Sequence, residues 1–181
     1  MRRSHVSETH RIMALTRLNT NAYGATVDLA SNVTGTLANS NLAAGNVIQV
    51  INAVVNTETI NNTDTWADTG LTASITPTST SNKILVIANV AGVGKGNGTY
   101  AYLKLLRDTT DIVADFETRG AYTGSTVTNK IGSCSVTYLD SPSSTSSLAY
   151  KTQLKSGADT AYAQTGDSNG KSSITLMEIA G

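Results

Sequence analysis

A glycine-rich stretch is the part of the sequence that comes nearest to a known ligand-binding motif. Residues 92–99 read Gly-Val-Gly-Lys-Gly-Asn-Gly-Thr, which is similar to a phosphate-binding loop. That motif needs a Lys-Ser/Thr pair opening a helix, so that backbone amides and the helix dipole meet the phosphate. Here Lys95 is followed by Gly96, and the residues after it read as a strand. We therefore predict a flexible hairpin loop at Gly92–Gly98 and no phosphate site.

The side chains that usually act as nucleophiles, bases or metal ligands are few. His5 and His10 are the only imidazoles, and both lie in the N-terminal tail, where we expect solvation. Cys134 is the only cysteine, so no intrachain disulfide forms, and we expect it to be a small core residue. We predict no catalytic residue, no metal site and no cofactor, and a protein that is not an enzyme.

Two further groups of residues are candidates for ligand binding. Asp108, Asp111, Asp115 and Glu117 could hold calcium or cleave glycosides, but no third ligand motif accompanies them, so we expect solvated carboxylates. Tyr100 and Tyr102 share one face of an expected strand. A tyrosine ring offers an apolar face and a hydroxyl, so this pair is a candidate recognition surface, with core or interface filling as the alternative.

The overall composition favours strands and excludes several partners. Ser and Thr total 47 of 181 residues, with 15 Asn and 15 Gly, and such residues are poor helix formers. Thirteen basic and 13 acidic residues give a net charge of zero, which argues against nucleic acid and against a membrane surface. No apolar run approaches the roughly 18 residues of a membrane span, and no signal peptide is recognisable, so we expect synthesis in the cytoplasm without membrane insertion.

The chain divides into two parts that differ in the spacing of their apolar residues. Residues 1–45 hold sparse apolar positions between turn-forming residues, which cannot bury enough surface alone to offset the entropy of ordering. This part is either a disordered linker or an extended arm that lies along another protein; we favour a docking arm, because apolar residues recur in it. Its expected docking residues are Val27, Leu29, Val33, Leu37 and Leu42.

Residues 46–181 alternate between short strand-like runs and turns, the pattern of one antiparallel β-sandwich. The alternation is clearest at 147–155, which predicts one dry and one wet face. The expected strands are 46–57, 71–76, 83–91, 99–107, 111–117, 129–139, 147–155, 160–165 and 172–180.

Two of these runs are apolar on both alternating faces. In 47–55 and in 83–91, Val, Ile, Leu or Ala occupies both sets of positions. A single sandwich has only one interior, so the second face predicts burial between copies of the chain. We therefore expect an oligomer with candidate interface residues Val47, Ile51, Leu85 and Ile87.

Several stretches resemble virion structural proteins of marine and cyanobacterial phages. The resemblance lies in Val47–Ile51, Thr65–Ile87, Leu139–Pro142 and the C-terminal Ser173–Ala180, and 32–37 resembles the linker repeats of phage tail fibres. It implies an all-β, jelly-roll-like sandwich after an N-terminal arm, similar to trimeric tumour-necrosis-factor-like heads, on the exterior of a virion. It carries no catalytic residues.

The sequence leaves three functions open. The first is a short tail fibre or receptor-binding head, whose arm enters a baseplate or tail hub and whose head contacts a host-surface glycan or protein. The second is a capsid cement (decoration) protein that binds the major capsid protein. The third is an enzyme acting on surface polysaccharide, which the absence of an acid/base pair disfavours. We favour the tail fibre.

Overall fold

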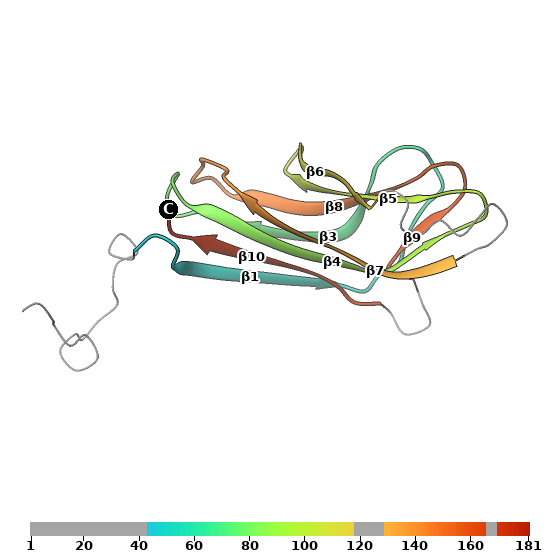
Figure 1. Cartoon of the computed structure of the whole chain (residues 1–181), viewed down its shortest axis with the longest axis horizontal. Helices are drawn as coiled ribbons and strands as arrows, with labels where there is room; N and C mark the ends of the chain where they lie inside the picture. Colours follow the sequence, from blue (N-terminus) through green and yellow to red (C-terminus); the bar gives the residue numbers. More distant parts are fainter. Residues whose placement is uncertain (1–42, 118–128, 166–169) are drawn as a thin grey trace, which may run out of the picture. The chain divides into compact units, whose positions relative to one another are not determined.

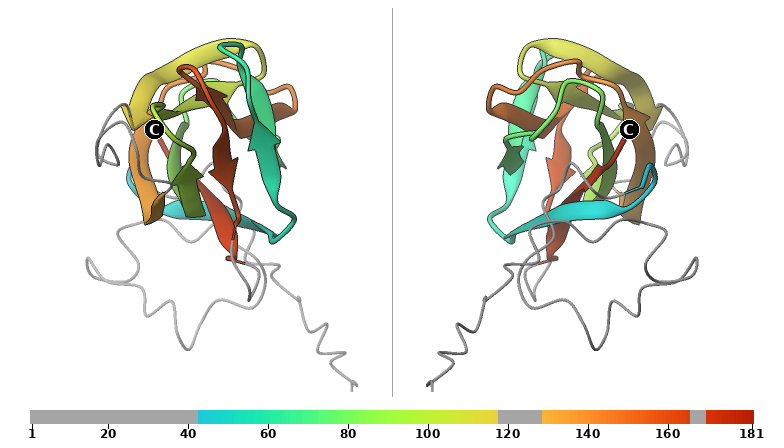
Figure 2. Two further views of the ribbon diagram at one scale, coloured as in Figure 1. Left: turned by 90° about the vertical axis from the view of Figure 1, so that its right-hand side faces the viewer. Right: turned by 90° about the vertical axis from the view of Figure 1, so that its left-hand side faces the viewer.

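The structure is a computed structural model that describes residues 43–117, 129–165 and 170–181. These residues form strands and turns only, and they belong to one compact unit, Ala38–Gly181. Two antiparallel sheets stack as a sandwich (Figure 1), and Figure 2 shows the two layers from either end. The all-β sandwich expected from the composition is therefore confirmed.

The larger layer, called here the β1 sheet, contains six strands in which β4 is central. Its order is β1-β10-β4-β9-β2. Strand β7 pairs with the edge of β4 that lies opposite β10. The strands are β1 (Val47–Val55), β2 (Thr59–Asn61), β4 (Lys83–Lys95), β7 (Asn129–Asp140), β9 (Ala161–Ala163) and β10 (Ser172–Ile179).

The second layer, called here the β3 sheet, contains four strands in the order β3-β8-β5-β6. They are β3 (Ala67–Ile75), β5 (Ala101–Arg107), β6 (Thr110–Glu117) and β8 (Leu148–Ser156). With the two three-residue strands β2 and β9 set aside, all connections but the β5–β6 hairpin cross between the layers. This arrangement, with the orders β1-β10-β4-β7 and β3-β8-β5-β6, is the topology of a jelly roll.

The core lies between the two sheets and is made of alternate residues of each strand. In β8 the burial pattern alternates without a break, with Leu148, Tyr150, Thr152 and Leu154 pointing inward, as the sequence predicted. Strand β10 alternates in the same way. The interior is mainly aliphatic, and Tyr150 is its only fully buried aromatic side chain among the described residues.

All nine expected strands are present, but the glycine-rich stretch was misread. Gly92–Lys95 is not a loop: it continues β4, and the side chains of Val93 and Lys95 are buried. Gly92 has a φ of 59°, and a Cβ there would lie 2.4 Å from the Thr165 carbonyl oxygen. Glycine is needed here because another backbone segment passes against the strand, and the sequence alone does not show that close approach.

Strand β2 and the first half of β3 were also missed. Strand β3 begins at Ala67, four residues before the expected start, and passes through Asp68 and Gly70. Aspartate and glycine are depleted in strands, which hid this segment. Gly70 has a φ of 78° and lies within a register shift of the β3–β8 pairing, so it marks a β-bulge.

Candidate interaction surfaces

The outer side of the β1 sheet carries a continuous band of apolar side chains. Val50 of β1 lies opposite Met177 of β10, Met177 opposite Leu85 of β4, and Leu85 opposite Leu139 of β7. Partners across antiparallel strands point to the same side of a sheet, so these four form one row. Together with Val47, Val54, Ile87 and Ile179, this row is called the apolar face below.

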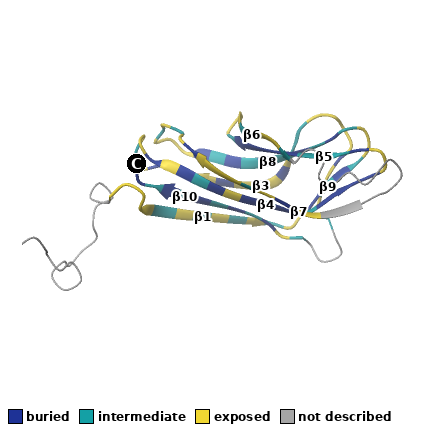
Figure 3. Ribbon diagram, viewed as in Figure 1, coloured by how far each residue is buried: buried dark blue, intermediate teal, exposed yellow. Residues whose placement is uncertain are grey.

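The apolar face is open to solvent in the single chain. Five of its large side chains are between 39% and 57% exposed, namely Val47, Val50, Val54, Ile87 and Leu139. No residue of β1 is fully buried, as the colouring of that strand in Figure 3 shows. Apolar residues scattered singly on a surface are ordinary, but a band crossing four adjacent strands is a feature of surfaces that another molecule covers.

The flanks of the apolar face are polar but uncharged. The next row pairs Asn52 with Thr175, whose side chains form a hydrogen bond of 2.9 Å. One row further, Ser135 donates to Asn89 at 2.8 Å. Among the residues of these four strands whose side chains the structure describes, Lys83 is the only charged one at the facing positions. A partner of this face therefore needs little charge of its own.

The expected interface residues divide between the two sides of the β1 sheet. Val47, Leu85 and Ile87 lie on the outer side, but Ile51 packs against the core and Val50 takes the outer position. The register of the β1–β10 pair shifts between Val47 and Gln49. A bulge there reverses the alternation, so residues that share parity in the sequence point to opposite sides.

The inner side of the β1 sheet holds a buried carboxylate near the C-terminal end of β10. Glu178 is fully buried, and its oxygens accept hydrogen bonds from Gln49, Asn82 and both the backbone amide and hydroxyl of Thr78, at 2.6 to 2.8 Å. Burial acts to raise the pKa of Glu178, but the four hydrogen bonds outweigh it and hold that pKa below its ordinary value of 4.5. The group is a structural anion, unsuited to donate a proton near neutral pH.

A second buried carboxylate joins the two sheets. Asp140 of β7 accepts hydrogen bonds from Arg107 of β5 at 2.6 Å and from the Tyr150 hydroxyl of β8 at 2.7 Å. Burial, and then the neighbouring Asp140 carboxylate, raise the pKa of Tyr150 far above its ordinary value of 10.0. Tyr150 therefore remains a hydrogen-bond donor, and the three side chains hold the layers together.

The outer side of the β3 sheet is charged and ion-paired, unlike the apolar face. Lys104 pairs with Asp111, Lys151 with Asp68, and Lys155 with Asp64, each at 2.9 Å. Asp68 also accepts a hydrogen bond from Gln153 at 2.6 Å. Partial burial acts to raise the pKa of Asp68, yet the bonds from Gln153 and Lys151 lower it overall. The lysines and aspartates balance, so these pairs carry no net charge.

Three aromatic side chains gather on this charged side and are called the aromatic cluster: Trp66, Tyr100 and Tyr102. The rings of Tyr100 and Tyr102 are 6.0 Å apart at an angle of 55°, so the structure brings the expected pair together. The Lys155 ammonium lies 5.0 Å from the Tyr102 ring and 5.4 Å from the Trp66 ring, and the Lys104 ammonium lies 4.7 Å from Trp66. Sequence reasoning missed Trp66, because it lies in the turn before β3, on no recognisable strand face.

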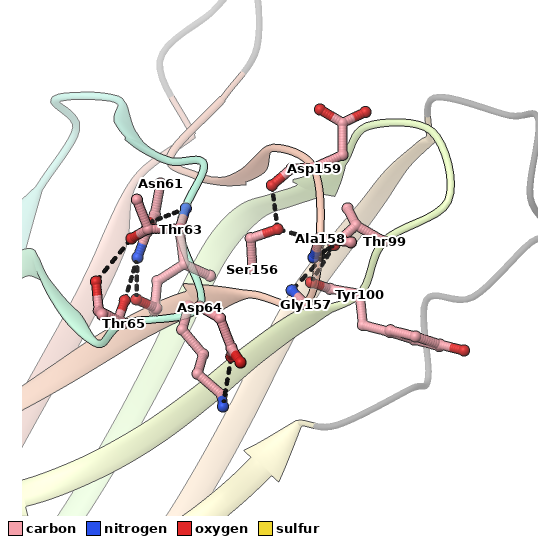
Figure 4. A network of polar contacts seen from close by, with 12 residues as sticks. Asn61, Thr63, Asp64, Thr65, Thr99, Tyr100, Ser156, Gly157, Ala158 and Asp159 are labelled. Carbon is pink, nitrogen blue, oxygen red and sulfur yellow. Dashed lines mark hydrogen bonds and ion pairs between the residues drawn. The ribbon is translucent and has the colours of Figure 1, made fainter.

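The turns that carry the aromatic cluster are fixed by hydrogen bonds (Figure 4). The Asn61 amide donates to the carbonyl oxygens of Thr65 and Leu154, both at 2.8 Å, which ties the turn before Trp66 to β8. The Thr99 hydroxyl accepts from the backbone amides of Gly157 and Ala158, at 3.0 and 2.8 Å, next to Tyr100. The two turns are therefore held in place by hydrogen bonds within the chain.

The remaining expected residues lie apart from these surfaces. Cys134 is buried in the core, as expected. Asp108 has a φ of 53° in the tight β5–β6 turn, and its carboxylate accepts from the Ala149 amide at 2.9 Å. No group of three or more His, Cys, Asp or Glu residues within 43–117, 129–165 and 170–181 is arranged to hold a metal ion. The arm residues Val27, Leu29, Val33, Leu37 and Leu42, both histidines and the Glu117 side chain lie outside the described part.

The described part of the chain also contains no helix long and apolar enough to cross a membrane.

The comparisons with known proteins find distant likenesses among solved structures only. No protein-family model matches the sequence, and no curated protein matches it. Among solved structures, the chain is similar to VP2 of infectious bursal disease virus in a subviral particle, with a TM-score of 0.47 and 9% sequence identity. The match covers 82% of this chain and 38% of the VP2 chain, so this chain spans less than two fifths of that protein. The likeness to phage virion proteins stays a prediction.

Proposed function

We propose that this chain is a structural protein of a bacteriophage particle, the head of a homotrimeric short tail fibre or receptor-binding assembly. The observation that carries the proposal is the apolar face, which crosses β1, β10, β4 and β7 and has Lys83 as the only charge at the facing positions that the structure describes. In this proposal the jelly-roll domain trimerises through that face, and residues 1–45 attach it to the particle.

The chemistry of the apolar face favours a second copy of the chain as its partner. The other outer side, on the β3 sheet, bears paired lysines and aspartates that would lose water on entering an uncharged contact. The apolar face can pack against another apolar face with few charges to remove from water. A closed ring of copies covers such a surface and leaves no open end.

The free edge of β1 supports the same assembly. Among the described strands, β1 pairs only with β10, which leaves the other edge of β1 without a strand partner there. The nine residues of β1 contain neither charge nor proline. Proteins usually protect such edges with charges, prolines or a covering segment, because open edges pair with other chains. A subunit contact over the apolar face would also cover the neighbouring edge.

The N-terminal arm supplies the attachment in this proposal. Three arms on one trimer bind jointly with far higher avidity than one arm alone, which suits a component that must stay on a particle. The expected partners are virion proteins of a baseplate, tail hub or capsid shell, at the virion exterior. The proposed role is non-catalytic. In its support, the buried carboxylates of Glu178 and Asp140 are engaged in hydrogen bonds within the fold.

The capsid decoration alternative uses the same trimer and the same arm. The two roles differ in copy number, since a fibre is present in tens of copies and a decoration protein in hundreds. Imaging of particles that carry the labelled protein would count the copies and locate them.

Deletion of residues 1–42 tests the arm, because it keeps the bond from the Gly45 amide to Ala180 at 2.8 Å. We expect a folded, soluble trimer that no longer joins particles. A matched control removes only residues 1–12, which contain none of the expected docking residues and should leave incorporation unchanged. Normal incorporation of the longer deletion would show that the arm is not the anchor.

A further inference from the structure

The rings of the aromatic cluster lie outside the hydrophobic core. The chain has one Trp, seven Tyr and one Phe, and its core is built mainly from aliphatic side chains. Yet Trp66, Tyr100 and Tyr102 are partly exposed on the outer side of the β3 sheet. Aromatic rings at a surface provide large contact areas at small entropic cost, which is why tryptophan and tyrosine are concentrated at binding sites.

The groups around the rings are suited to hydroxyls. Asp64 and Asp68 keep exposed carboxylate oxygens, and Gln153 and Lys155 supply donors beside them. Carboxylates accept hydrogen bonds and lysine donates them, so a ligand bearing many hydroxyls can bind both kinds of group. A ligand that lies flat on the rings would meet these polar groups at its rim.

The charge balance excludes two other classes of ligand. Three lysines are matched by three aspartates, so a phosphate or nucleic-acid backbone would have to displace existing ion pairs to find a cation. A purely apolar partner would leave those charges without water. A neutral molecule with apolar faces and hydroxyl edges fits, and a pyranose sugar has both.

We propose that the aromatic cluster, with Asp64, Asp68 and Gln153, is a binding site for a neutral, pyranose-containing glycan. The inference rests on the proposed function for its setting, because a receptor-binding head needs a ligand on its exposed side. The apolar face and the aromatic cluster lie on the outer sides of different layers, so a trimer that buries the first leaves the second open.

The supporting turns favour a preformed site. A Cβ at Gly157 would lie 3.2 Å from the Tyr100 ring and 3.4 Å from the Tyr102 ring, so both rings pack directly on that glycine. The Asn61 and Thr99 hydrogen bonds hold the two turns on either side. Little ordering entropy is then lost on binding.

The sole tryptophan makes the test direct. Trp66 is the only tryptophan of the chain, so the intrinsic fluorescence of the intact protein reports on the cluster itself. We would titrate the full-length protein with neutral hexasaccharides of glucose, mannose, galactose and xylose. Hexagalacturonate would serve as the anionic comparison. We expect a saturable change in Trp66 emission with at least one neutral hexasaccharide and none with hexagalacturonate.

Variants can distinguish the contribution of the rings to sugar binding from a general loss of structure. Tyr102→Ala should weaken binding about tenfold, because it removes one stacking surface. Tyr138→Ala, which changes a partly exposed tyrosine on β7 of the other sheet, should bind as the unchanged protein does. Gly157→Val should weaken binding as Tyr102→Ala does, by displacing both rings, and circular dichroism would show that each variant is folded.

Three results would overturn the inference: no binding to any neutral hexasaccharide, binding to hexagalacturonate alone, or full binding by folded Tyr102→Ala. None of them would bear on the proposed function, which is tested by trimer mass and particle incorporation. Loss of the trimer with sugar binding retained would in turn refute the assembly and leave the glycan site standing.

Discussion

The two outer sides of the sandwich are built from the same strand alternation but have opposite chemistry. On the β1 sheet the outward positions carry Val, Ile, Leu and Met, flanked by uncharged polar groups and Lys83. On the β3 sheet they carry ion pairs and the aromatic cluster. The inward positions of both sheets form one core and set the fold. The outward positions are free to differ, so their contrast indicates function.

The largest effect is expected from a charge placed on the apolar face. Val50→Lys puts a lysine at a position that is exposed in the single chain, so the subunit should still fold. In a trimer the same lysine would be buried without a partner, at a cost of several kcal/mol per copy. We expect monomers by analytical ultracentrifugation and an unchanged circular dichroism spectrum.

The matched control puts the same charge on the other side. Thr72→Lys, at an exposed outward position of β3, should leave the trimer intact. If both variants assemble equally well, the apolar face is not the subunit contact.

The buried anion beneath the apolar face should affect stability and not assembly. Glu178→Gln keeps the shape of the side chain but loses the charge that four hydrogen bonds stabilise. We expect a loss of about 1–3 kcal/mol in the free energy of unfolding, measured by urea denaturation. Glu58→Gln, on an exposed turn, should change it by less than about 0.5 kcal/mol.

Acid should lower the stability of the fold by protonating Glu178. The pKa of Glu178 is lower in the fold than its ordinary value of 4.5, so its contribution to stability is complete above that pH. The contribution is lost as the pH falls from about 4.5 through the lowered pKa. Thermal unfolding between pH 6 and pH 3 should show a smaller decline in Glu178→Gln than in the unchanged protein. Equal declines would mean that other carboxylates control the acid response.

The smallest effect is expected on the ion-paired side. Asp68→Asn removes a pair that is exposed to solvent, and such pairs contribute roughly 0–1 kcal/mol. The neighbouring Gln153 can still bond to the amide that replaces the carboxylate. We expect a change of at most about 0.5 kcal/mol in unfolding free energy, falling further in added salt. A large loss would show that the charged side contributes to the fold itself.

The sequence predicted the strands well because their signal is local. Alternation at Leu148–Leu154 follows directly from the two-residue period of a strand, and it is confirmed residue by residue. The glycines of β4 were misread because their reason is tertiary: Gly92 faces the Thr165 backbone, far along the chain. The order of strands depends on pairings such as β4 with β10, which no local pattern encodes.

The candidate surfaces were predictable only in part. Val47, Leu85 and Ile87 were identified from apolar residues on both sides of their strands, but the bulge before Gln49 exchanged Ile51 for Val50. Tyr100 and Tyr102 were identified from their shared parity, whereas Trp66 joins them only through the turn that Asn61 fixes. Parity along a strand is visible in a sequence, and a shift of register is not.

The proposed trimer can be tested by the mass of the intact protein in solution. Sedimentation equilibrium of the full chain over a range of concentrations should give three times the mass of one chain, with little dependence on salt, because the proposed contact is mainly apolar. A single-chain mass maintained at high concentration would contradict the account, since the apolar face would then remain exposed.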